Sequence, residues 1–151
     1  MPEFTTFMET ALDQARRAGL RGEIPVGAAL VSPDGTVVVR DGNRMREMCD
    51  PTAHAEMQVI RAACASLGTE RLTGFDLYVT LEPCAMCAAA IAAARIRRLY
   101  YGARDVKSGG VEQGARVFSH TQTHHAPEIF PGIAETECAA LMRDFFAKKR
   151  R

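Results

Sequence analysis

The sequence predicts an α/β protein with a mixed sheet packed between helices. Segments with apolar residues at helical spacing alternate with short, β-rich apolar runs. The predicted order is α-β-β-α-β-α-β-(β)-α, in which two adjacent strands form a hairpin and later strands are separated by single helices. Single-helix connections favour right-handed crossovers and therefore a parallel portion, whereas the hairpin adds an antiparallel edge.

The first half of the chain predicts a helix, a hairpin and a second helix. Gly19 and Gly68 follow the two helical patterns and are typical stops. Pro33, Asp34 and Gly35 have the chemistry of a hairpin turn between two β-rich runs. The expected elements are a helix over 3–18, strands over 26–32 and 36–40, a polar loop over 41–51, and a helix over 53–67.

The second half predicts further strands that are each followed by a helix or a loop. Glu82 and Pro83 end an apolar run and precede an alanine-rich segment, a pattern that indicates a strand followed by a helix. A long glycine-containing loop comes next, then a short apolar piece and a final helix. The expected elements are strands over 75–81 and 96–102, helices over 84–95 and 135–149, and a short apolar piece over 129–133.

Length and composition predict one domain over residues 1–151. Apolar residues make up 47% and charged residues 25%, which is ordinary globular usage. We expect no membrane segment and a cytoplasmic location, because no apolar run approaches the length of a membrane helix and the N-terminus lacks a signal-peptide layout. Five cysteines, an odd number, fit reduced thiols better than a disulfide framework.

The formal net charge of +1 excludes nucleic-acid binding through bulk charge alone. Basic residues nevertheless gather at the C-terminus over 148–151 and at Arg95, Arg97 and Arg98. Two interpretations stay open: contacts with phosphates, or solvated helix ends that complement the helix dipole.

A cluster of metal-ligand residues is the strongest functional signal. Cys84 and Cys87 stand three residues apart, so both sulfurs can face one ion from a single helix. The start of a helix also favours thiolates, because unpaired N–H groups and the helix dipole lower the thiol pKa. His54 lies at the start of another predicted helix and adds an imidazole if both helices begin at the same end of the sheet. Three protein ligands leave one zinc position open for water, as in catalytic sites.

Glu56 is the candidate proton shuttle of this site. Zinc lowers the pKa of bound water toward about 7 and so provides a nucleophile. Glu56 follows His54 by two positions and is not needed as a ligand. Its carboxylate can take the proton of water and return it as a general acid.

The alternative to a catalytic zinc site is a structural one, which would need a further protein ligand. A cysteine pair taken alone is more often structural, redox-active or incidental. A closed zinc site would require a fourth side chain, and none of the candidates has paired spacing with Cys84. His124 and His125 are adjacent in a predicted loop, where neighbouring side chains point in different directions. Solvated side chains are therefore the simpler interpretation of these two histidines. The candidates are Cys49, Cys138, His120, His124 and His125.

Three segments resemble the bacterial tRNA-specific adenosine deaminase (TadA-like) family of zinc deaminases: 50–56 (Asp-Pro-Thr-Ala-His-Ala-Glu), 80–87 (Thr-Leu-Glu-Pro-Cys-Ala-Met-Cys) and 101–105 (Tyr-Gly-Ala-Arg-Asp). The resemblance implies a cytidine-deaminase-like three-layer α/β/α sandwich with a mixed five-stranded sheet, and a homodimer. It also implies one Zn²⁺ per subunit and a catalytic glutamate. The implied site residues are His54, Cys84 and Cys87 on the metal, Glu56 in catalysis, and Asn43 and Ala55 on the substrate.

The implied reaction is conversion of adenosine to inosine at the wobble position of a tRNA anticodon loop. Phe145 and Phe146 followed by a basic tail resemble the tRNA enzymes. Segment 109–118 departs from the family pattern. If it borders the site, it indicates either a different pattern of RNA contacts or an alternative reaction: deamination of free guanine, cytosine, adenine or their nucleosides. A third interpretation is a noncatalytic RNA-binding module, which would not require Glu56.

Overall fold

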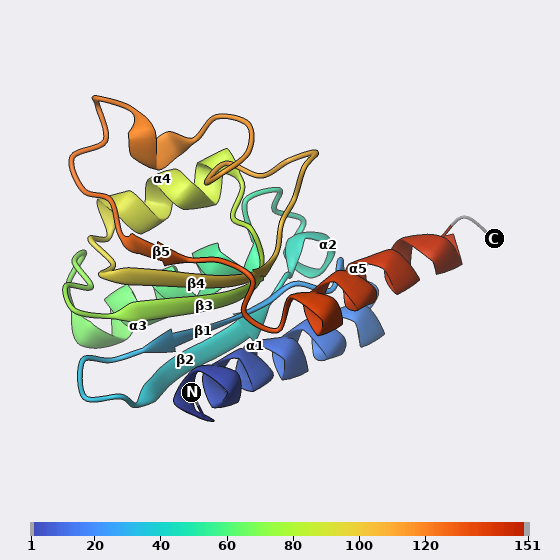
Figure 1. Cartoon of the computed structure of the whole chain (residues 1–151). Coiled ribbons are helices and arrows are strands. Elements are labelled where there is room, and N and C mark those ends of the chain that lie inside the picture. Colours follow the sequence, from blue (N-terminus) through green and yellow to red (C-terminus); the bar gives the residue numbers. More distant parts are fainter. Residues whose placement is uncertain (1, 150–151) are drawn as a thin grey trace.

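The computed structural model describes residues 2–149, with side chains from Phe7 onward. One five-stranded sheet lies between two layers of helices (Figure 1). The elements are α1 (Pro2–Leu20), β1 (Gly27–Val31), β2 (Val37–Gly42), α2 (Met45–Met48), α3 (Ala55–Leu67), β3 (Asp76–Leu81), α4 (Ala85–Ala93), β4 (Arg98–Ala103), the 3-10 helix η1 (Val117–Ser119), β5 (Glu128–Phe130) and α5 (Glu135–Lys149).

The sheet is mixed, as the sequence predicts. Its strand order is β2-β1-β3-β4-β5. β1 pairs antiparallel with both β2 and β3, whereas β3 with β4 and β4 with β5 are parallel. α4 connects β3 to β4, so a helix provides the crossover between parallel neighbours.

Two apolar cores lie on opposite faces of the sheet. α1 and α5 cover one face, and α3 and α4 cover the other (Figure 1). Successive side chains of a strand point to opposite faces, so Leu77 and Val79 join the α3/α4 core while Tyr78 joins the other. Tyr78 stacks on Tyr100 with ring centroids 4.3 Å apart. The α/β/α sandwich is therefore confirmed.

The expected polar loop over 41–51 is wrong in part. β2 continues to Gly42, and α2 forms a short helix where only loop is expected. The cause is a distant carboxylate: Glu23 accepts hydrogen bonds from the backbone N–H groups of Arg46 (3.1 Å) and Glu47 (2.9 Å). These donors belong to the first turn of α2 and would otherwise lack partners.

The predicted helices occur with small shifts at their ends. α3 begins at Ala55 and α4 at Ala85, one or two residues later than expected, so His54 and Cys84 are the N-cap residues. Gly68 ends α3 in the left-handed conformation, with φ of 67°. The short apolar piece over 129–133 becomes β5, which pairs with β4 in parallel.

Within residues 2–149, no helix has both the length and the apolar character needed to cross a bilayer. Residues 150 and 151 of the basic C-terminal segment lie outside the described part of the chain, which includes Lys148 and Lys149 at the end of α5.

Candidate active site

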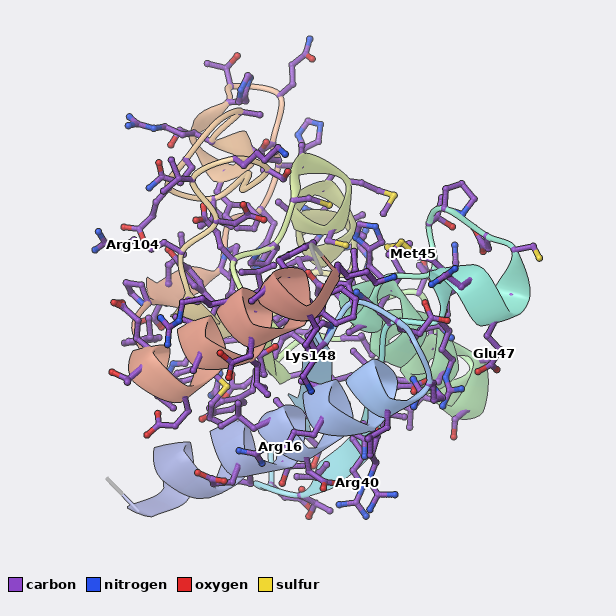
Figure 2. The ribbon with its side chains drawn as sticks, turned by 90° about the vertical axis from the view of Figure 1, so that its right-hand side faces the viewer. Arg16, Arg40, Met45, Glu47, Arg104 and Lys148 are labelled. Atoms are coloured by element: carbon purple, nitrogen blue, oxygen red, sulfur yellow. The ribbon has the colours of Figure 1, made fainter. Side chains whose placement is uncertain are left out.

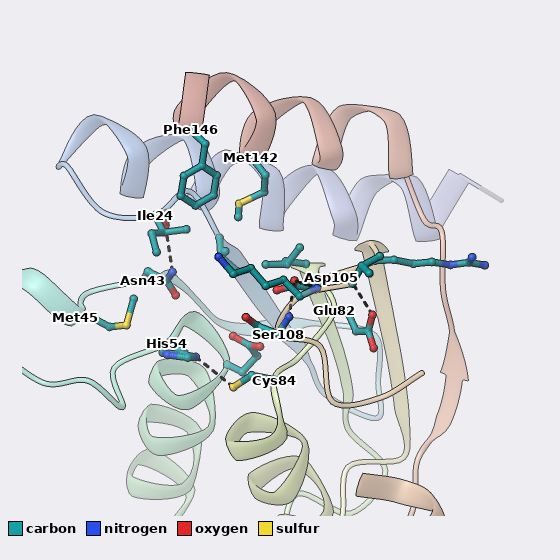
Figure 3. A pocket seen from close by; sticks show the side chains of 16 residues that line it. Ile24, Asn43, Met45, His54, Glu82, Cys84, Asp105, Ser108, Met142 and Phe146 are labelled. Atoms are coloured by element: carbon teal, nitrogen blue, oxygen red, sulfur yellow. Dashed lines mark hydrogen bonds between the residues drawn. The ribbon is translucent and has the colours of Figure 1, made fainter. Parts of the chain in front are cut away.

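Two helix starts bring the predicted metal ligands together. His54 precedes α3 and Cys84 precedes α4, and both caps have extended backbone conformations. The Nδ1 atom of His54 lies 3.6 Å from the Sγ atom of Cys84 and 3.5 Å from that of Cys87. Figure 3 shows His54 and Cys84 facing each other below the pocket. Their ligand atoms all lie within 4.8 Å of one another.

This arrangement fits a tetrahedral zinc ion. With Zn–S of about 2.3 Å and Zn–N of about 2.1 Å, a nitrogen and a sulfur ligand at tetrahedral angles lie about 3.6 Å apart. The two distances from Nδ1 to the sulfurs agree with this value. The donor set of one imidazole and two thiols also suits zinc.

The alternative of a closed, four-ligand site finds no support among residues 2–149. His54, Cys84 and Cys87 form a group without a further His, Cys, Asp or Glu ligand. The other candidates have different surroundings. His120 Nε2 lies 2.7 Å from the carbonyl oxygen of Ala115, and His125 Nε2 lies 2.7 Å from that of Ile96. An open ligand position is what hydrolytic zinc chemistry needs.

The pKa values of the two thiols shift in opposite directions. A hydrogen bond with Cys87 lowers the pKa of the Cys84 thiol to about 4. The same hydrogen bond, with burial, raises the pKa of Cys87. The hydrogen bond with Cys84 raises the pKa of His54. Both sulfurs must be deprotonated to bind a cation, so metal binding releases the protons that the ligands still carry.

Glu56 lies in the first turn of α3 and lines the same pocket as His54 and Cys84. Its side chain is buried, and burial raises its pKa to about 7. A carboxyl group with a pKa near neutrality can both accept and return a proton. It stands outside the group of metal-ligand atoms, in agreement with the sequence interpretation.

Asn43 also lines the pocket, and its side chain makes two hydrogen bonds to the backbone beside it. Its side-chain oxygen accepts the N–H of Ala55 (2.8 Å), and its side-chain nitrogen donates to the carbonyl of Ile24 (3.2 Å). The first bond satisfies an unpaired N–H at the start of α3, next to His54. Ala55 is buried and is absent from the pocket lining. The backbone N–H of Ala55 is the group that it could offer a substrate, and this N–H already donates to Asn43.

The pocket above the ligands has a volume of about 560 Å³. One wall comes from Ile24 and Met45, and another from Met142 and Phe146 of α5 (Figure 3). A third wall is the loop 104–108 after β4. The sequence did not predict that Ile24 and residues of α5 line the pocket. Apolar residues at helical spacing indicate a face that packs on the core, and they do not reveal an open cavity beside it.

The expectation that segment 109–118 borders the site needs correction. The pocket is lined by the preceding residues 104–108, whereas 109–118 does not contribute to it. Gly110 is buried behind the metal-binding turn, and Val117 and Phe118 pack on the α3/α4 core. The physical reason is Glu82, a buried carboxylate missed in the sequence, which binds the backbone of this segment. The sequence feature that could have identified Glu82 is its position as a charged residue directly after an apolar strand.

Comparison with known proteins agrees with this geometry. The family described as cytidine and deoxycytidylate deaminase zinc-binding region matches residues 1–103. A tRNA-specific adenosine deaminase from Agrobacterium fabrum is 62% identical over 150 residues, which cover 99% of this chain and 98% of that protein. The chain belongs to the tRNA-specific adenosine deaminase family. It is thus a zinc-dependent hydrolytic enzyme of the deaminase class, with His54, Cys84 and Cys87 positioned to hold the ion.

Other members and structures extend the match. A tRNA-specific adenosine deaminase from Rickettsia typhi is 43% identical and covers 95% of this chain and 97% of its own length. A chain solved in structural studies of A-to-I editing by tRNA:A34 deaminases at the wobble position is 63% identical, with a TM-score of 0.89 over 91% of this chain and 99% of that chain. Guanine deaminase from Bacillus subtilis is 28% identical, with a TM-score of 0.63 over 97% of this chain and 93% of that chain.

Proposed function

We propose that this enzyme converts adenosine to inosine at the wobble position of a tRNA anticodon loop, with release of ammonia. The observation that carries the proposal is the buried Glu56 beside a zinc site that has an open ligand position. Relatives named for the same activity support the choice of substrate, since they match nearly the full length of the chain.

Each site residue has one role in this reaction. His54, Cys84 and Cys87 would hold a zinc ion, which would lower the pKa of a bound water molecule toward neutrality. Glu56 accepts a proton from that water as its oxygen attacks C6 of the purine, and it donates a proton to the ring nitrogen. Glu56 then carries the remaining proton of the added hydroxyl to the amino group, the C6–N bond breaks and ammonia leaves. Water and adenosine thus give inosine and ammonia.

The pocket suits a base that has been removed from its stack. A volume of about 560 Å³ accepts a purine nucleoside but no duplex. An anticodon loop presents unpaired bases, so little pairing energy is lost when one enters a pocket. Asn43 remains our proposed contact to the base, through the second N–H of its side-chain amide, which is not needed for Ile24. Ala55 is the weaker proposal, because its N–H is engaged.

Cations near the pocket favour a polyanionic substrate. Arg104 and Lys107 line the pocket from the loop after β4, and both are exposed. Figure 2 looks onto the side of the molecule that carries Arg104 together with Lys148 of α5. Lysine and arginine at such positions neutralise phosphates, and phosphate contacts dominate the affinity for nucleic acids.

The decisive experiment uses an anticodon stem-loop whose first anticodon nucleotide is adenosine, with inosine read by sequencing. The matched control places the same adenosine in a duplex stem. We expect inosine only at the unpaired wobble position. Absence of conversion at saturating zinc-loaded enzyme would overturn the proposal, and ammonia release from free guanine, cytosine, adenine or their nucleosides would replace it with the small-molecule alternative.

Three further assignments are proposed from the sequence: the domain from its length, the location from its composition, and the dimer from the family resemblance. The chain is a single domain over residues 1–151, works in the cytoplasm and forms a homodimer. The continuous sheet and its two cores are compatible with one domain. Analytical ultracentrifugation at micromolar concentration tests the dimer, and a monomer mass would refute it.

A further inference from the structure

Glu82 is a buried carboxylate with no role in the reaction as described. It follows β3, stands two residues before the first zinc thiol, and is only 2% exposed. Its Oε1 atom accepts the backbone N–H of Asp105 (3.1 Å). Its Oε2 atom accepts those of Val111 (3.1 Å), Glu112 (2.8 Å) and Gln113 (3.0 Å). One side chain thus engages two separate stretches of the loop that follows β4.

This loop also touches the metal-binding turn directly. The N–H of Gly110 donates to the carbonyl of Pro83 at 2.8 Å. A Cβ atom added to Gly110 would lie 2.5 Å from the nitrogen of Ala85 and 2.8 Å from the carbonyl carbon of Cys84. The backbone of the loop is therefore seated against the turn that presents the thiols, with no space for a side chain between them.

We propose that Glu82 is a positioning residue that joins the zinc site to the substrate pocket. Its carboxylate holds residues 109–113 against the turn, so that Cys84 keeps its direction toward His54. The same side chain holds Asp105, so that residues 104–108 remain in place as a pocket wall. Glu82 thereby holds the zinc site and the pocket wall formed by residues 104–108 in a fixed position relative to each other.

Bond strength explains why a carboxylate occupies this position. Hydrogen bonds to an ionised acceptor are stronger than those between neutral groups, and a cluster of backbone N–H groups stabilises buried negative charge without a cation. Groups behind metal ligands commonly change metal affinity or activity by 10- to 100-fold when they are removed. A glutamine in place of Glu82 preserves the shape but loses the charge and turns an amide NH₂ toward N–H donors.

The test compares Glu82→Gln with Glu23→Gln. Glu23 is a matched control, because it is 1% exposed and also accepts two backbone N–H groups, from Arg46 and Glu47, away from the thiols. We expect Glu82→Gln to release zinc to a chelator about tenfold faster than wild type. Its amides at 111–113 should also exchange hydrogen faster. Zinc release from Glu23→Gln should stay within about twofold of wild type, whatever its loss of stability.

A second measurement needs no variant and covers the case in which Glu82→Gln fails to fold. Coupling between two sites is reciprocal, so zinc removal from the wild-type enzyme should increase exchange at amides 111–113 more than at Arg46 and Glu47. Equal changes at the two groups of amides would overturn the proposal. So would a folded Glu82→Gln that releases zinc at the wild-type rate, or equal acceleration in both variants, which indicates a general loss of stability.

The inference rests on the zinc site of the proposed function but not on its RNA substrate. Zinc release and amide exchange are measured without turnover. A failure to edit tRNA would therefore leave the role of Glu82 intact, and unchanged zinc release would leave the editing proposal intact.

Discussion

Glu56 shows how placement changes the chemistry of an ordinary side chain. An exposed glutamate is ionised at neutral pH, whereas burial raises the pKa of Glu56 to about 7. Proton transfer is most effective when the pKa of the group lies near the working pH. The short distance along the chain from His54 made the residue recognisable in the sequence, but only burial explains its suitability.

Replacement of Glu56 by glutamine should separate catalysis from metal binding. The side chain is not among the metal-ligand atoms, so we expect one zinc ion per chain by mass spectrometry and an unchanged fold. Inosine formation should fall by about 10²- to 10⁴-fold, the usual contribution of a general acid or base. The exposed Glu70→Gln variant is the control, with wild-type rates expected. Retained editing in Glu56→Gln would disprove the proton-shuttle role.

Asn43 has a structural task as well as a proposed substrate contact. Asn43→Ala leaves the buried N–H of Ala55 without its acceptor, which costs about 1–3 kcal/mol in the free energy of unfolding. Urea denaturation at fixed zinc concentration measures this loss. The variant Thr73→Ala, at an exposed position, is the control, and we expect it to have little effect. Equal midpoints for the two variants would show that the hydrogen bond to Ala55 contributes nothing.

α5 is attached to the sheet at a few close contacts. Cys138 is its buried residue, and a Cβ atom on Gly102 of β4 would lie 2.3 Å from the Cys138 sulfur. The helix can approach β4 this closely because glycine has no side chain. Farther along, Met142 and Phe146 line the pocket, and Met142 also packs against the edge of the α3/α4 core. One helix thus serves both as a cover for the sheet and as a wall of the site.

The thiol of Cys138 should make stability depend on pH above 9. Burial raises its pKa from 9.0 to about 12. Because the folded value is the higher one, this contribution is fully present below pH 9 and is lost as the pH rises toward 12. At pH 10.5 the loss is about 2 kcal/mol in the free energy of unfolding. Urea denaturation of wild type and Cys138→Ser at pH 8 and 10.5 measures it, and identical pH dependence would contradict the expectation.

Secondary structure followed from the sequence where the signal was local. Gly68 and the Pro-Asp-Gly turn marked boundaries through their own backbone preferences, and the structure has a helix end and a hairpin there. α2 was missed because its first turn depends on Glu23, more than twenty positions away. The placement of 109–118 was wrong for the same reason, since Glu82, which binds its backbone, lies 29 positions before Val111.

The zinc site joins parts of the chain that are distant in sequence. His54 caps the start of α3, Cys84 caps the start of α4 and Cys87 lies in its first turn, and the two helices pack on the same face of the sheet. A ligand that binds only the folded state stabilises that state by mass action. Metal binding and folding are therefore linked in this enzyme.

Zinc removal should lower the unfolding temperature. At a free zinc concentration about 1,000 times the dissociation constant, binding contributes about 4 kcal/mol. For a chain of this length that corresponds to a shift of about 10 °C. Calorimetry of the enzyme with zinc and after treatment with a chelator measures the shift, and readdition of zinc is the control. Equal unfolding temperatures would show that the site does not bind zinc in the folded state.

The sequence alone determined the α/β class and the zinc ligands and indicated the proposed proton shuttle, because these depend on residue types at short, fixed spacings. His54 and Glu56 share one helix start, and Cys84 and Cys87 share another. Only the tertiary structure decided which residues form the pocket walls, that Asn43 supports α3, and that Glu82 holds the loop after β4. These features arise from contacts between residues far apart in the chain, which no local pattern encodes.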